Sequence, residues 1–111
     1  MKPLTLPEIR GAITQLAGWH RRGVSITRTF QFDDFVAAMK FVNRVARAAE
    51  KAQHHPDIII QWNRVRLTLS THDAGGLTMK DFALAAMCNR FKEAQGKITV
   101  PVWSKTHAAS R

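Results

Sequence analysis

The spacing of the apolar residues changes repeatedly along the chain, and this change restricts the possible folds more than any other feature. Residues 5–18, 34–52 and 78–96 carry apolar side chains at helical spacing. Residues 19–32 and 58–69 alternate apolar with polar side chains instead, which is the spacing of strands that bury one face. The order predicts an α+β fold, α-β-β-α-β-β-α: a four-stranded antiparallel sheet with three helices packed on one face.

Length and composition fit a single small domain. The chain has 111 residues, of which 45% are hydrophobic, enough for one modest core. Cys88 is the single cysteine, so no intramolecular disulfide is possible and a reducing compartment fits. No stretch approaches the roughly 20 apolar residues of a membrane span, and no signal-peptide pattern is present. We therefore expect a cytoplasmic protein without a membrane partner, with a domain at 1–96 and a loosely ordered basic tail at 97–111.

Local signals mark where the helices begin. Thr5 and Glu8 have the spacing of a capping box. Asp33 or Asp34 is expected to cap the central helix, and residues 78–81 form another N-terminal capping sequence. Gly18 is a plausible end of the first helix.

The central helix has an unusually wide apolar side. Its apolar arc spans about 200°, which is wider than the stripe that one core requires. Phe41 and Ala48 lie in the added part of this arc. We therefore predict a homodimer or homotetramer that uses Phe41 and Ala48 at its interface. The alternative is that alanine occurs on an exposed face simply because it is a good helix former.

The second predicted hairpin gathers histidines. A turn at residues 63–64 sets Trp62 opposite Val65 and Ile60 opposite Leu67, which places apolar residues on one face. Extended past Pro56, this register sets His55 opposite His72. Polar residues surround the same end of the hairpin: His54, Ser70, Thr71 and Asp73.

Three imidazoles at one sheet end favour proton transfer, because histidine gains and loses a proton near neutral pH. Metal binding is the rival interpretation. His54 and His55 are neighbours in an extended segment and point to opposite sides, and no acidic or thiolate ligand has a helpful spacing. We therefore expect no metal. A Ser70 or Thr71 nucleophile is weaker still, since no nucleophile-elbow glycines surround these residues.

The same residues resemble the signature of the pterin-4a-carbinolamine dehydratases. The matching positions are Glu50, His54-His55-Pro56, Trp62, His72 and Asp81. The similarity extends over roughly residues 16 to 90, including Gly18-Trp19, residues 30–35, residues 41–46 and residues 75–78. A combination of this length is much more specific than a single His-His pair.

The resemblance implies the fold given above and a reaction. Members remove water from 4a-hydroxytetrahydropterin and return the quinonoid dihydropterin, which supports pterin recycling. The pterin is the substrate, and no cofactor is implied. By motif position, His54 and His72 resemble the proton-transfer pair of this catalytic set, and His55 resembles the histidine that positions the pterin.

The resemblance also assigns the surrounding residues. The expected substrate-binding set is Gln53, His54, His55, Ser70, Thr71, His72 and Asp73. Glu50, Trp62 and Asp81 are supporting residues; Glu50 and Asp81 either orient imidazoles or stabilise helix ends, and the second role is favoured. Animal members commonly have Asp where this chain has Gln53.

Binding functions compete with the enzyme. Pterin dehydratase-like proteins of carboxysome-bearing bacteria serve as non-enzymatic Rubisco assembly factors, and animal members also act as dimerisation cofactors of a homeodomain transcription factor. Lys and Arg number 17 against 8 Asp and Glu, a net charge of +9, and the surplus lies outside residues 31–60. The basic ends suit an acidic protein client such as Rubisco, with a carboxysome-associated location in that case. Nucleic acid is not the expected partner.

Overall fold

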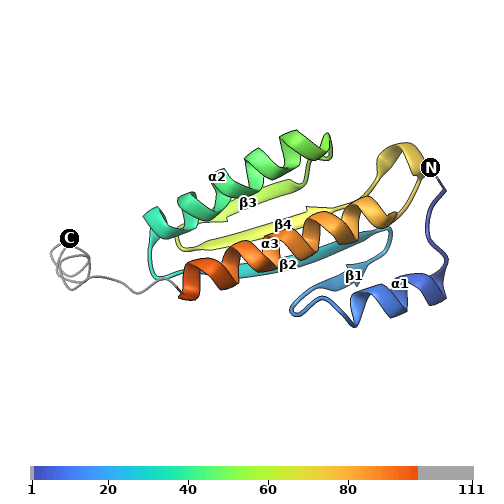
Figure 1. Ribbon diagram of the computed structural model, residues 1–111, viewed down its shortest axis with the longest axis horizontal. Helices are drawn as coiled ribbons and strands as arrows, with labels where there is room; N and C mark the ends of the chain where they lie inside the picture. The colour runs from blue at the N-terminus through green and yellow to red at the C-terminus, as the bar shows by residue number, and fades with distance from the viewer. Residues whose placement is uncertain (1, 98–111) are drawn as a thin grey trace, which may run out of the picture.

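The computed structural model describes residues 2–97 and contains the predicted order of elements (Figure 1). The elements are α1 (Leu6–Ile13), β1 (His20–Arg22), β2 (Ser25–Gln31), α2 (Phe35–Ala52), β3 (Asp57–Gln61), β4 (Arg64–Leu69), η1 (His72–Ala74) and α3 (Met79–Lys97). The short 3₁₀ helix η1 was not predicted. The predicted α+β fold class is confirmed, whereas the tail beyond Lys97 lies outside the described residues.

The four strands form one antiparallel sheet in the order β1-β2-β4-β3. Figure 1 shows α2 and α3 lying against one face of this sheet, with α1 beside β1. β2 and β4 are the central strands, and their inward side chains are apolar except for Arg28, which donates to Asn89 of α3. The sheet therefore forms one layer of the core and the helices form the other.

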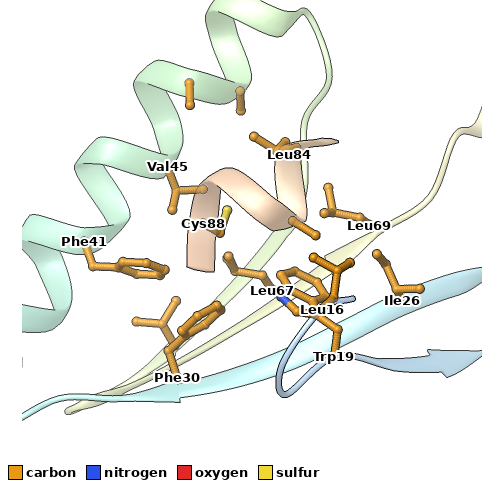
Figure 2. Packing of buried hydrophobic residues seen from close by; sticks show 14 of the residues in the cluster. Leu16, Trp19, Ile26, Phe30, Phe41, Val45, Leu67, Leu69, Leu84 and Cys88 are labelled. Carbon is orange, nitrogen blue, oxygen red and sulfur yellow. The ribbon is translucent and has the colours of Figure 1, made fainter. Parts of the chain in front are cut away.

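Aromatic residues from the sheet and from α2 form the centre of the core (Figure 2). The Phe41 ring lies 4.7 Å from the Phe30 ring and 5.0 Å from the Phe32 ring, measured between centroids. Trp19 meets Phe30 edge to face at 6.1 Å. Cys88 of α3 is buried in the same core.

The predicted helix starts are confirmed. The Thr5 side chain accepts the Glu8 backbone N–H and Glu8 accepts the Thr5 N–H, which completes the capping box. Asp34 caps α2 by accepting the Ala37 N–H at 2.8 Å. The first helix ends at Ile13, five residues before the predicted end at Gly18. The chain then continues through turns to Trp19.

The interface predicted at Phe41 and Ala48 is wrong. Phe41 is 0% exposed and Ala48 is buried within the chain itself, so neither side chain offers surface to a second copy. The wide apolar arc of α2 instead contacts both the sheet and α3. The large apolar residues of α2 that are exposed are Phe35 and Val36 at its first turn. Homo-oligomerisation itself stays a prediction.

The predicted register of the second hairpin is also wrong, by two residues. Ile60 pairs with Val65 and Ile58 with Leu67, so Trp62 and Asn63 form the turn. The side chain of Asn63 is buried and donates to the Phe32 carbonyl at 2.9 Å, while Phe32 N–H donates to the Asn63 carbonyl. These contacts with the end of β2 hold Asn63 in the turn. A shift of two residues keeps every side chain on its predicted face.

Among residues 2–97, no helix combines the length and the apolar character that crossing a membrane requires.

Candidate active site

A polar pocket of about 260 Å³ lies where α2, β4, η1 and α3 meet. Its lining consists of Gln53, His54, His55, Ser70, Thr71, His72, Asp73 and Lys80. Every residue of the predicted substrate-binding set therefore lines one pocket. The predicted ladder pairing of His55 with His72 is not formed, because the strand pairing ends at Asp57 and Thr68.

The end of α2 separates the two adjacent histidines. Gln53 has a left-handed backbone conformation, with φ 53°, and its N–H donates to Glu50 O while the His54 N–H donates to Ala49 O. The chain reverses at this point, so His54 is buried and His55 is exposed. The Gln53 amide nitrogen also donates to Glu50 O at 2.7 Å, which anchors this side chain at the pocket rim.

His54 forms a buried pair with Asp81 of α3. Its Nε2 lies 2.6 Å from Asp81 Oδ1, and the two side chains are 9% and 0% exposed. An ionised carboxylate only accepts hydrogen bonds, so the proton of a neutral His54 resides on Nε2. Nδ1 is then an acceptor. Among the described residues no buried side-chain nitrogen lacks a partner, so Nδ1 is not sealed off from solvent, and His54 itself lines the pocket.

Asp81 has a second set of donors on its other oxygen. Oδ2 accepts the Thr71 hydroxyl at 2.8 Å and the Thr78 backbone N–H at 2.9 Å. The Thr78 hydroxyl in turn accepts the Lys80 N–H, so Thr78 and Asp81 cap α3. Asp81 thus stabilises a helix end and also orients an imidazole. On the sequence alone these two roles are alternatives, and the helix end is favoured.

His55 is held in a much weaker way. Its Nε2 lies 2.8 Å from Glu50 Oε1, but the two side chains are 61% and 74% exposed. Solvent weakens such a pair, so Glu50 restricts the His55 ring without holding it rigidly. This difference separates His54, which is fixed, from His55, which can adjust to a bound molecule.

The loop after β4 presents His72. Thr71 and Gly76 form an isolated bridge, and Gly75 closes η1 with a left-handed φ of 75°. His72 and Asp73 are therefore exposed on a short closed loop, and both line the pocket. Lys80 adds a positive charge from the first turn of α3.

Three residues at or near the site differ from the sequence expectation. Trp62 is 63% exposed in the β3–β4 turn and does not line the pocket. Lys80 and Thr78 were missed, although the capping sequence at residues 78–81 was recognised as a helix start. Within the described residues, no group of three or more His, Cys, Asp or Glu side chains is arranged to hold a metal ion.

The fold and the pocket together define a small α+β protein whose site is built from imidazoles, one of them oriented by a buried carboxylate. The chain belongs to the pterin 4 alpha carbinolamine dehydratase family, whose sequence profile matches residues 2–91.

Relatives support this assignment along most of the chain. A protein of Koribacter versatilis is 51% identical over 79% of this chain and 94% of its own length, and one of Acidobacterium capsulatum is 56% identical over 78% and 94%. Both carry the name "Putative pterin-4-alpha-carbinolamine dehydratase".

Two solved structures share the fold. A transcriptional coactivator/pterin dehydratase from Brucella melitensis has a TM-score of 0.80 at 38% identity and covers 82% of this chain and 99% of its own. A pterin dehydratase-like protein described as a RuBisCO assembly factor in the alpha-carboxysome has a TM-score of 0.56 at 20% identity, covering 67% and 86%. The second likeness shows the fold alone.

Proposed function

We propose that this protein dehydrates 4a-hydroxytetrahydropterin to the quinonoid dihydropterin by metal-free acid and base catalysis. The observation that carries the proposal is the convergence of His54, His55 and His72 on one pocket, with His54 held by buried Asp81. Family membership supports the same reaction class.

In the proposed reaction, His54 is the base. Its Nδ1 is proposed to accept the proton from N5 of a pterin bound in the pocket, while the Nε2–H stays bonded to Asp81. Because Asp81 fixes the ring orientation and the tautomer, the acceptor nitrogen is presented before the substrate arrives.

His72 is the proposed acid. The N5–H electron pair forms the N5–C4a double bond as the C4a–O bond breaks, and the departing oxygen takes a proton from the His72 imidazolium. The pterin loses one hydrogen and one hydroxyl group, which leave as water. Proton exchange with solvent then restores neutral His54 and protonated His72.

The other pocket residues are proposed to hold the pterin. Ser70 and Gln53 offer hydroxyl and amide groups to the amide-like edge of the ring, and His55 adjusts its position against the ring. Asp73 and Lys80 add one charge of each sign at the rim. Gln53 in place of the Asp of animal members keeps an acceptor oxygen at this position, since its nitrogen bonds to α2.

The test supplies enzymatically generated 4a-hydroxytetrahydropterin and follows its absorbance decay. We expect the wild type to exceed the uncatalysed rate, and the His54→Ala, His72→Ala double variant to match it. His20→Ala is the matched control, because His20 is exposed on β1 and does not line the pocket. A wild type that only matches the uncatalysed rate would refute the dehydratase proposal.

A Rubisco assembly factor is the alternative proposal, prompted by the fold shared with the RuBisCO assembly factor structure. The intact histidine set favours the enzyme, because a binding function would not require an oriented imidazole. If the wild type has no dehydratase activity but co-sediments with Rubisco, the assembly-factor proposal is favoured instead.

A further inference from the structure

We propose that Thr71 and Thr78 form a one-directional hydrogen-bond relay that sets the tautomer of His54 through Asp81, which makes both threonines positioning residues. This inference rests on the proposed function for its catalytic meaning. Its structural claim stands on the buried network alone.

The directions in this network follow from counting hydroxyl hydrogens. Thr71 and Thr78 have one each, and their oxygens lie 2.8 Å apart. Thr71 donates its hydrogen to Asp81 Oδ2, so it can only accept from Thr78. Thr78 therefore donates to Thr71, and its own oxygen accepts the Lys80 N–H at 3.2 Å. Every hydrogen points toward Asp81.

Burial makes this direction hard to reverse. Thr78 is 1% exposed, Asp81 is 0% exposed and Thr71 is also buried. Water cannot easily reach Thr78 or Asp81 in such a place, so turning the Thr78 hydroxyl away from Thr71 would leave a buried polar atom without a partner. The Thr78 N–H adds a second, fixed donor to the same oxygen.

This arrangement affects which ring nitrogen of His54 carries the proton. Two donors occupy Oδ2, so this oxygen must be an acceptor, and Oδ1 remains for His54 Nε2. The relay therefore fixes which oxygen of Asp81 faces His54. The ionised carboxylate accepts the Nε2–H there, which leaves Nδ1 without a proton. Thr71 was expected to bind substrate, but its hydroxyl hydrogen is already used inside the protein. Its contribution is to position Asp81.

The relay makes an unusual prediction for Asp81→Asn. An amide has one acceptor and one donor end, and the donors at the Oδ2 position force its oxygen to that side. The amide nitrogen then donates to His54 Nε2, so the imidazole proton must move to Nδ1. A similar tautomer error follows the loss of the triad carboxylate in serine proteases.

The experiment is ¹⁵N NMR of the imidazole nitrogens, which needs no dehydratase activity. We expect His54 to be protonated at Nε2 in the neutral wild type and at Nδ1 in Asp81→Asn. Retention of the Nε2–H tautomer in the folded Asp81→Asn variant would overturn the relay. The wild type offers a second measurement: the hydroxyl protons of Thr71 and Thr78 should exchange slowly with water, and rapid exchange of both would equally overturn the proposal.

Kinetics separate positioning from substrate contact. Thr78 does not line the pocket, so Thr78→Val should lower kcat with little change in KM, and Thr78→Ser should restore kcat. Thr71→Val removes the hydrogen bond to the carboxylate and should lower kcat about tenfold. If the wild type is inactive but the His54 tautomers are as expected, the proposed function is refuted and the relay is not. If the wild type is active but the threonine variants keep its kcat and Asp81→Asn keeps the His54 tautomer, the relay is refuted and the proposed function is not.

Discussion

The side chain of Arg28 lies directly across Gly18, leaving no room for a Cβ atom. A Cβ built on Gly18 would lie 2.6 Å from Arg28 Nε and 2.8 Å from its Cδ, and Gly18 has a φ of +83°. Arg28 is held there by hydrogen bonds to Ala17 O and Asn89 Oδ1. Burial of its guanidinium lowers the pKa of Arg28, although the Glu93 carboxylate opposes this effect.

Gly18→Ala is therefore expected to destabilise the protein. The left-handed backbone costs about 1 kcal/mol for a residue with a Cβ, and displacement of Arg28 adds to that cost. Urea unfolding measures the difference. The matched control is Gly11→Ala in α1, where a Cβ meets nothing within 4 Å and helix propensity should stabilise the protein by about 0.5–1 kcal/mol. Effects of equal sign at the two glycines would contradict this account.

Phe41→Ala tests the corrected role of Phe41. Because Phe41 is fully buried between Phe30 and Phe32, the substitution should reduce the free energy of unfolding by about 3–5 kcal/mol. Phe35→Ala on the same helix should cost much less, since Phe35 is 47% exposed. Unfolding followed by circular dichroism, with light scattering on the folded protein, distinguishes the two roles. A Phe41→Ala protein of native stability but smaller assembly would restore the interface interpretation.

The two His–carboxylate pairs should differ sharply in stability. Asp81→Ala leaves the Thr71 hydroxyl and the Thr78 N–H without their buried acceptor, at a cost of about 3 kcal/mol. Glu50→Ala removes only an exposed partner of His55 and should cost less than about 0.5 kcal/mol. Chemical denaturation of both variants makes the comparison, and similar losses in the two would contradict the burial argument.

Cys88 should be unreactive in the folded protein. Burial raises the pKa of its thiol from 9.0 to about 12, so almost no thiolate forms near neutral pH. A thiol reagent at about pH 8 should therefore label Cys88 only after denaturant is added. Rapid labelling of the native protein would show that the thiol is accessible.

The same thiol should weaken the fold in alkali. The unfolded chain can ionise Cys88 above its ordinary pKa of 9.0, whereas the folded chain keeps the thiol neutral up to about 12. Stability is thus lost as pH rises through this interval, by about 1.4 kcal/mol between about pH 8 and pH 10. Cys88→Ala lacks this contribution, so the stability difference between wild type and variant should change by that amount. A difference independent of pH would contradict the prediction.

Local patterns explain why the elements were predicted well. The alternation in residues 58–69 and the caps at Thr5 and Asp34 depend on neighbours within a few positions, which the sequence displays directly. The register of β3 with β4 does not depend on such near neighbours. It follows from the contacts of Asn63 with Phe32, a residue 31 positions away.

The residues of the candidate site likewise fall into those that the sequence motif predicts and those that depend on tertiary contacts. The histidines and their pocket neighbours were found from the motif, and they do line one pocket. Thr78 was visible only as a helix cap, because its bond with Thr71 depends on how the loop at residues 71–76 closes. Lys80 reaches the pocket from the first turn of α3, a position that no local pattern distinguishes.

The α+β order of elements, the buried faces of the central strands and the set of histidines could be predicted from the amino-acid sequence, because periodicity and motif spacing are properties of the chain. Tertiary structure decided which partner each side chain meets. It buried Phe41, shifted the hairpin by two residues and joined His54 to Asp81, 27 positions away. These outcomes depend on how the helices pack against the sheet, since packing alone brings distant donors and acceptors within hydrogen-bond distance and excludes the water that would compete for them.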